Sequence, residues 1–205
     1  MAVGALFQGL VLGWSMIIPI GAQNSYILSQ GIKRNYHYLI ACICLICDVV
    51  LTTLGVLGGG KLIADNTLLM NIIGWGGMLF LLTYATQALI RAYRFQYFPL
   101  GSVQTLSSRK AVILTTLAVT LLNPHVYLDT VVILGNIGST FEETERLYFT
   151  AGAILAATIW FFTLAGLAAK LAPWLSKSKV QRWVDIFIAF IMTAVAYKLF
   201  VTLLS

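Results

Sequence analysis

The sequence predicts an all-α integral membrane protein with about six transmembrane helices. The first observation is composition: 60% of the 205 residues are hydrophobic and only 10% are charged, with a mean hydropathy of +0.90. Polar side chains are therefore too few to coat a soluble globule. The second is that residues 1–32 and 147–169 contain no Lys, Arg, Asp or Glu, and each run reaches the roughly 20 residues that cross a bilayer. The alternating pattern of membrane β-strands is absent, so the spans are predicted to be helices.

The first predicted span, residues 3–31, is too long to be one straight helix. An unbroken helix of that length would measure about 43 Å, whereas the hydrocarbon core of a bilayer is about 30 Å thick. The sequence supplies a break at Pro19-Ile-Gly-Ala-Gln-Asn24. Pro19 lacks a backbone donor and Gly21 loosens the turn, so we expect the helix to be interrupted there.

Five further spans follow. The second carries Asp48 at its middle, and the third carries Gly74-Trp-Gly-Gly77, whose small residues permit close helix packing. The fourth is interrupted by Asn123-Pro-His-Val-Tyr-Leu-Asp129, and the fifth is preceded by Thr140-Phe-Glu-Glu143, which fits a capping box. These spans are expected at residues 38–62, 68–92, 111–135, 147–171 and 184–204.

The chain is predicted to be a single membrane transport domain (1–205) made of two repeats. Repeat one covers about residues 1–92, the polar segment 93–110 is the linker, and repeat two covers about 111–205. Each half opens with a proline-interrupted span, and aligning Pro19 with Pro124 places Asn24 opposite Asp129. Three spans per half make the repeats inverted. Inverted repeats with broken first helices are typical of transporters, whose half-helix ends face the substrate.

Basic residues predict the orientation. With six crossings, ten Lys and Arg residues lie in the first, third and fifth connections and three on the other side. The positive-inside rule then places both termini outside the cytoplasm. Five crossings remain an alternative, because a broken segment at membrane depth can be re-entrant.

Two carboxylates, Asp48 and Asp129, lie inside predicted spans. A central aspartate costs roughly 2.5 to 3.5 kcal/mol on insertion scales, so both are predicted to be functional. The alternative is a neutral aspartic acid that is hydrogen-bonded to a neighbouring helix. Asp185, three residues after Arg182 near a helix start, is interpreted as a surface pair and a partner of the helix dipole.

Other residues keep two interpretations. Pro19 and Pro124 are either functional breaks or packing kinks. His125 is either a helix-interface residue or a proton carrier. Trp160 is either a packing residue or part of a substrate path.

Four motifs carry a resemblance that covers essentially the whole chain. Residues 19–34, Cys47-Asp48, Trp75-Gly-Gly77 and Asn123-Pro-His-Val-Tyr-Leu-Asp129 together resemble the lysine/arginine exporter (LysE-type) family, closest to its arginine exporters. Ala22 stands where that family usually has a second proline. The resemblance implies export of L-arginine, and sometimes L-lysine, across the bacterial inner (cytoplasmic) membrane by a multi-pass protein. It also implies that Asp48 and Asp129 are important. Relatives that export neutral amino acids generally lack an acid at the position of Asp129, so its presence favours a cationic substrate.

The chemistry of the residues agrees with a cationic substrate. Carboxylates accept from a guanidinium or ammonium group, and half-helix N-termini can hold an α-carboxylate. The chain has no nucleotide-binding G-x-x-x-x-G-K-[ST] motif, so transport is predicted to be secondary, plausibly by proton antiport. The predicted helix breaks are Pro19, Gly21 and Pro124. The predicted substrate-binding or translocation residues are Gln23, Asn24, Asp48, Asn123, His125, Tyr127 and Asp129.

The sequence also bears on other functions and partners. The three cysteines, Cys42, Cys44 and Cys47, crowd one apolar helix and are interpreted as core residues, so no metal, cofactor or catalytic residue is predicted. The cations form short clusters between spans, which argues against a nucleic-acid partner and for the lipid bilayer. An exporter of another amino acid or small metabolite, an intramembrane enzyme and a channel remain alternatives, although H-E-x-x-H and G-x-S-x-G are absent. A homo-oligomer also remains open.

Overall fold

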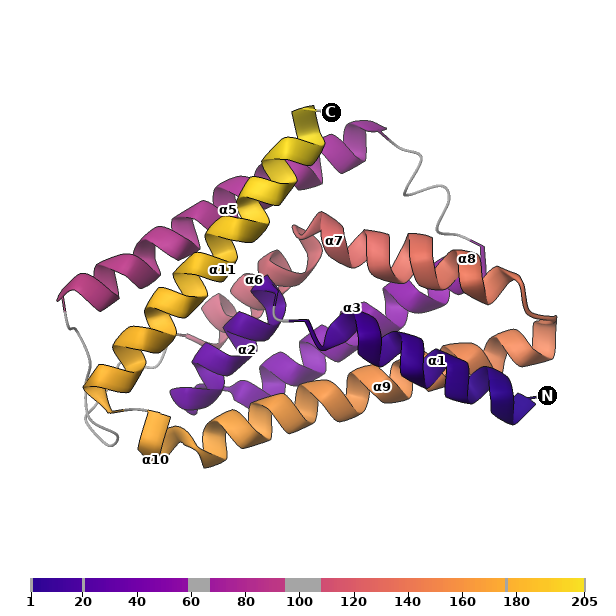
Figure 1. Cartoon of the computed structure of the whole chain (residues 1–205), viewed down its shortest axis with the longest axis horizontal. Helices are drawn as coiled ribbons and strands as arrows, with labels where there is room; N and C mark the ends of the chain where they lie inside the picture. Colours follow the sequence, from indigo (N-terminus) through magenta and orange to yellow (C-terminus); the bar gives the residue numbers. More distant parts are fainter. Residues whose placement is uncertain (1, 20, 59–66, 95–107, 176, 205) are drawn as a thin grey trace.

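A computed structural model describes the chain except for residues 1, 20, 59–66, 95–107, 176 and 205. All regular structure within the described residues is helical, and they contain no strand (Figure 1). Three of their helices, α3, α9 and α11, are long and apolar enough to cross a bilayer, and a fourth crossing results if the bent pair α1 and α2 is one span. The prediction of an all-α membrane protein is confirmed.

The first half contains the predicted helix break. Helix α1 ends two residues before Pro19, and α2 begins directly after Gly21, with a bend of 77° between them. Helix α3 is shorter than predicted, because the chain turns through Gly58 at a φ of +94°, which glycine adopts without steric cost. The described helices of this half are α1 (Ala2–Ile17), α2 (Ala22–Ile32), α3 (His37–Val56) and α5 (Thr67–Arg94).

The second half also opens with an interrupted helix. Pro124 begins α7, a position where the missing N–H of proline costs nothing, and a π-helix follows directly. The predicted linker, 93–110, lies mostly outside the described residues. The described helices of this half are α6 (Arg109–Leu121), α7 (Pro124–Tyr127), the π-helix η1 (Leu128–Ile133), α8 (Leu134–Ser139), α9 (Glu143–Lys170), α10 (Ala172–Leu175) and α11 (Ser178–Leu204).

The predicted capping box at Thr140 to Glu143 is wrong. The Thr140 hydroxyl donates to the Ile137 carbonyl at 2.7 Å, so Thr140 completes the end of α8. Glu142 is the N-cap of α9 without a side-chain capping bond, and Glu143 is the first helical residue. The turn that ends one helix therefore uses the residue that was expected to begin the next.

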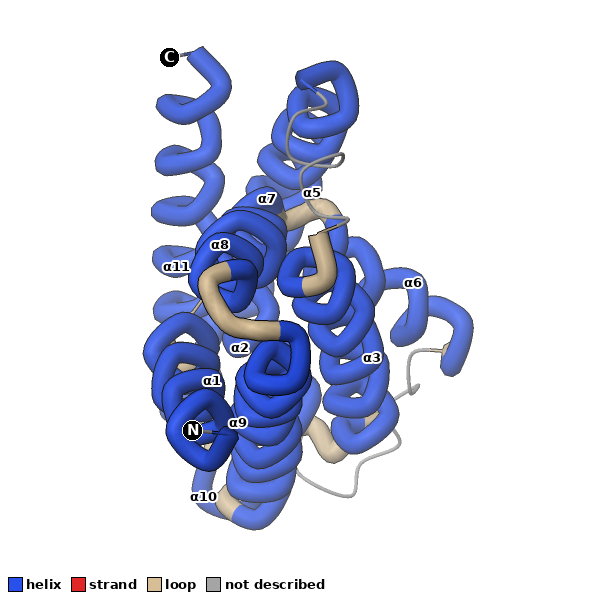
Figure 2. Tube along the Cα trace, turned by 90° about the vertical axis from the view of Figure 1, so that its right-hand side faces the viewer, coloured by secondary structure: helices blue, strands red, loops and turns tan. Residues whose placement is uncertain are grey.

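Helix α9 lies between α1 and α3, as the end-on view in Figure 2 shows. Three glycines make the crossing of α1 and α9 unusually close. A Cβ at Gly9 would overlap the Phe149 carbonyl, a Cβ at Gly152 would overlap the Leu6 carbonyl, and Gly13 faces the small residues of α9. Such small residues let helix backbones approach in a membrane, where van der Waals contact drives association.

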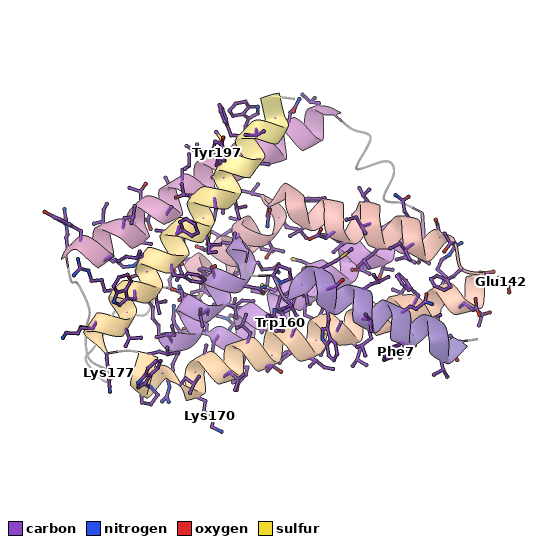
Figure 3. The ribbon with its side chains drawn as sticks, in the orientation of Figure 1. Phe7, Glu142, Trp160, Lys170, Lys177 and Tyr197 are labelled. Atoms are coloured by element: carbon purple, nitrogen blue, oxygen red, sulfur yellow. The ribbon has the colours of Figure 1, made fainter. Side chains whose placement is uncertain are left out.

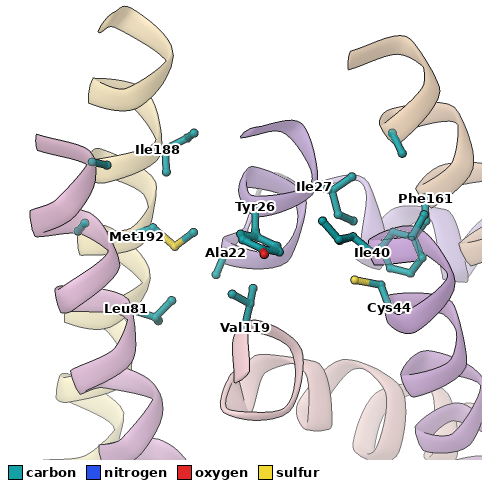
Figure 4. Close-up of a cluster of buried hydrophobic side chains, with 14 of the residues drawn as sticks. Ala22, Tyr26, Ile27, Ile40, Cys44, Leu81, Val119, Phe161, Ile188 and Met192 are labelled. Atoms are coloured by element: carbon teal, nitrogen blue, oxygen red, sulfur yellow. The ribbon is translucent and has the colours of Figure 1, made fainter. Parts of the chain in front are cut away.

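Helices α5 and α11 pack along each other, and α2 is enclosed between them, α6 and α9. Almost every residue of α2 is buried, and its side chains enter the largest hydrophobic cluster together with Phe161 and Met192 (Figure 4). The predicted close packing at residues 74–77 is also confirmed, because a Cβ at Gly77 would overlap the Leu122 carbonyl. The helix break before α7 thus rests directly on α5.

Candidate functional site

The break between α1 and α2 is held by the side chain of Asn24. Its amide nitrogen donates to the Ile17 carbonyl at 2.6 Å and to the Pro19 carbonyl at 3.0 Å. Its amide oxygen accepts from the indole N–H of Trp160 at 3.1 Å; Trp160 lies near the middle of α9 (Figure 3). Carbonyls at a helix end have no intrahelical donor, and inside a membrane they need another partner. Asn24 supplies that partner and ties the break to α9.

The second break is held in a similar way by a different residue. The Tyr127 hydroxyl donates to the carbonyl of Leu121, the last residue of α6, at 2.9 Å. Asn123, at the break itself, is buried, and its carbonyl accepts from the Val126 N–H at 3.1 Å. The side chains of Asn24 and Tyr127 therefore both donate hydrogen bonds to backbone carbonyls at a helix break.

Asp48 and Asp129 are brought together between the two breaks. Helix α3, which carries Asp48, packs against the π-helix η1, which carries Asp129 in its first turn. The two carboxyl groups are close enough to interact electrostatically, and the Gln23 side chain also faces Asp48. Asp48 is buried, with 7% of its surface exposed, and Asp129 is partly exposed. The fold therefore brings the two acids predicted from the sequence close to each other.

The polar groups at this site are not all satisfied within the described residues. Asp48 Oδ1 and Gln23 Nε2 are buried and have no hydrogen-bond partner there. An unpartnered carboxylate oxygen in a membrane interior is costly, and a cation or a hydrogen-bond donor beside it would relieve that cost. The arrangement can accept a guanidinium, an ammonium group or a proton.

The start of α2 offers complementary chemistry. Its N-cap is Gly21, which has no side chain to accept from the first N–H groups of the helix. Helix N-termini with such groups attract anions. Gln23 lies in this first turn and faces Asp48, so a helix end with N–H groups suited to an anion lies beside Asp48.

Two predicted site residues are described only through their backbones. The backbones of Pro124 and His125 begin α7, but the described structure does not include their side chains. Among the described residues, no group of three His, Cys, Asp or Glu side chains is placed to hold a metal ion, and Cys42, Cys44 and Cys47 are free.

One polar contact was not predicted from the sequence, and one acid was predicted to lie at the surface although it is buried. The bond between Trp160 and Asn24 joins residues 136 positions apart, and only the interpretation of Trp160 as a path residue pointed toward it. Asp185 is not a surface residue: it is 6% exposed and pairs with Arg91 of α5 at 3.0 Å. Its nearest cation along the chain, Arg182, suggested a local pair, because a partner on another helix leaves no signal in local spacing.

Comparisons with known proteins place the chain in a family. The family model described as "LysE type translocator" matches residues 14–203. "Putative amino-acid transporter YggA" from Aeromonas salmonicida is 46% identical over 94% of this chain and 93% of its own length. "Arginine exporter protein ArgO" from Pectobacterium carotovorum is 44% identical over 94% of both chains, and the protein of the same name from Klebsiella pneumoniae is 44% identical over 94% of this chain and 92% of its own. No solved structure matches the chain. The chain belongs to the LysE-type translocator family, and it is therefore a membrane transporter and not an enzyme.

Proposed function

We propose that this protein exports basic amino acids, L-arginine and also L-lysine, from the bacterial cytoplasm across the inner membrane. One observation carries the proposal: Asp48 of α3 and Asp129 of η1 lie on packed helices, close enough to interact electrostatically, beside two helix breaks. Relatives named arginine exporters, at 44% identity over nearly the full length, support arginine as the substrate.

The two ends of the substrate have separate partners in this proposal. The guanidinium or ammonium group binds between Asp48 and Asp129, where a cation relieves the repulsion between two carboxylates. The α-carboxylate binds at the N-terminus of α2, where Gly21 leaves the first N–H groups without a side-chain cap. A cationic side chain can make charge-assisted bonds to the two carboxylates that a neutral side chain cannot make, so the site favours cationic substrates.

Coupling to protons follows from the same acidic pair. Export of arginine moves one positive charge against an inside-negative potential, which costs about 2.3 kcal/mol per 100 mV. A proton that enters as arginine leaves would cancel this cost. Because a proton and a guanidinium both neutralise the pair, they compete for one site, and that competition is the basis of antiport.

Two inverted repeats of three spans each form the proposed architecture. The helix contacts support it, because many of them occur in pairs related by exchange of the halves. In the second half α9 takes the place that α3 has in the first, and α11 takes the place of α5. Helix α9 packs on the broken helix of the first half, α1 and α2, and α3 packs on the broken helix of the second half, α6, η1 and α8. In the same way α11 contacts α2, and α5 contacts α7. The positions of charges support the proposed orientation: Lys170 and Lys177 lie at one end of the molecule and Glu142 at the other (Figure 3). The lysine-bearing end is the cytoplasmic end in this proposal.

Proteoliposomes loaded with labelled arginine test the function. The wild-type protein should release the label down its gradient, whereas Asp48→Asn and Asp129→Asn should lose release while still inserting, because each keeps its size but lacks the charge that compensates the guanidinium. Glu143→Gln is the matched control, since it removes an exposed carboxylate at the start of α9. Normal release by both aspartate variants at normal protein levels would contradict the proposed site.

A further inference from the structure

A second polar region lies at the other end of α2, between α2, α5 and α11. Tyr26, Ser29 and Lys33 recur at helical spacing on one side of the α2 segment. The Tyr26 ring meets the Tyr84 ring of α5 edge-on, with 5.9 Å between centroids, and Tyr84 also faces Ser29. We call this region the α2 seam. It consists of Tyr26, Ser29, Lys33, Tyr84, Arg91 and Asp185.

The seam ends in a cluster of charges. Arg91 donates to Asp185 through two nitrogens, Nη2 to Oδ1 at 3.0 Å and Nε to Oδ2 at 3.4 Å. The Asp185 side chain is only 8% exposed. Lys33, directly after α2, lies near both: burial lowers its pKa, Arg91 lowers the pKa further, and Asp185 opposes the shift. The Arg91 and Asp185 pair thus joins α5 to α11, and the electrostatic influence of both residues reaches Lys33 at the end of α2.

The seam differs from the other tight helix contacts of the protein. The crossing of α1 and α9 is closed by glycine and alanine, whereas the seam contains hydroxyl and charged groups. Ser25, one turn before Ser29, is fully buried, and its hydroxyl has no hydrogen-bond partner among the described residues. Buried ion pairs are weak stabilisers, and polar groups inside membrane proteins commonly mark pathways.

The geometry points to the α2 seam as the closed cytoplasmic entry route for the cationic amino acid, with Asp185 as the first acid that the substrate meets. This inference rests on the proposed function. Helix α2 is 11 residues long, so about 16 Å of one helix joins the seam to the Asp48 and Asp129 site. The Arg91 guanidinium occupies the place on Asp185 that the guanidinium of arginine takes when the seam opens. Lys33 leaves as α2 separates from α5 and α11.

Thiol labelling in inside-out vesicles tests the route. The variant Ser29→Cys, with the native cysteines replaced by alanine, places a near-isosteric probe at a residue that is 4% exposed. The control is Ala156→Cys, fully buried against Gly13 in the closed crossing of α1 and α9. If the seam opens, Ser29→Cys should react with a membrane-impermeant thiol reagent at least about tenfold faster than the control. Arginine should slow this reaction, and modification should block export.

Three outcomes are distinguishable. If Ser29→Cys is as unreactive as Ala156→Cys while its export continues, the route is wrong and the proposed function stands. If it reacts, but arginine neither slows labelling nor crosses the membrane, the proposed substrate is wrong, and the route proposed for it is wrong as well. If it reacts and arginine crosses without affecting labelling, the seam opens for another reason and the route is wrong. If Ser29→Cys does not fold, Ser25→Cys is the replacement probe, because Ser25 is fully buried on the same helix.

Discussion

Replacing Asn24 should destabilise the protein by an amount that the structure predicts. Asn24→Leu keeps a similar volume but removes three hydrogen bonds, two to carbonyls at the end of α1 and one from Trp160. Each bond contributes about 0.6 to 1.5 kcal/mol, from averages in membrane and soluble proteins. The expected loss is therefore about 2 to 4 kcal/mol of unfolding free energy, toward the upper end if the carbonyls stay buried.

Trp160→Phe separates the contribution of the bond between Asn24 and Trp160 from that of the two carbonyl bonds at the helix break. It leaves the two carbonyl bonds of Asn24 in place and removes only the indole N–H, so we expect a loss of about 1 kcal/mol. The measurement is unfolding by SDS in mixed micelles for the wild type, both single variants and the double variant. The double-mutant cycle should give a coupling of about 0.5 to 1.5 kcal/mol between the two residues. Unfolding of Asn24→Leu within about 0.5 kcal/mol of wild type, with no coupling, would refute the assigned role.

Four further predictions concern packing, charge, coupling and orientation. Gly9→Leu should prevent α1 from docking on α9 and should sharply lower the amount of folded protein, measured by size-exclusion chromatography. Gly4→Leu should not lower it, because a Cβ added at Gly4 would meet no atom within 4 Å. Asp129→Glu should retain part of the efflux that Asp129→Asn loses, because the charge persists; equal losses would argue against a charge role. Wild-type arginine efflux at a clamped membrane potential should rise with an inward proton gradient, and indifference to the gradient would exclude antiport. In a cysteine-free background, Glu142→Cys should react with impermeant thiol reagents in intact cells and Lys177→Cys should not; the reverse pattern would invert the topology.

The sequence was sufficient for the features that depend on local chemistry. Pro19 and Pro124 lie at real interruptions, because a missing N–H or a fixed φ acts on the helix that contains it. Asp48 and Asp129 were recognisable as candidates, because an ionisable residue inside an apolar span is conspicuous without knowledge of its neighbours. Their proximity is a tertiary fact that no local pattern contains.

Features that depend on residues far apart along the chain could not be predicted from the sequence, for physical reasons. The Arg91 and Asp185 pair joins residues 94 positions apart on two different helices, so local spacing could not reveal it. Thr140 could end one helix or begin the next, and only the observed bond to Ile137 decides between them. The π-helix at Leu128–Ile133, against which α3 packs, could not be predicted either, because apolar residues alone do not distinguish a π-helix from an α-helix.

The crossing of α1 and α9 has a consequence for how the protein is made. Residue 143, where α9 begins, is synthesised 126 residues after residue 17, where α1 ends (143 minus 17). At about 5 to 20 residues per second, the ribosome needs about 6 to 25 s to cover that distance. During this interval the glycine face of α1 has no partner, and Asn24 cannot yet accept from Trp160. The newly inserted first helix must therefore wait in the lipid, or against the insertion machinery, until the second half of the chain arrives.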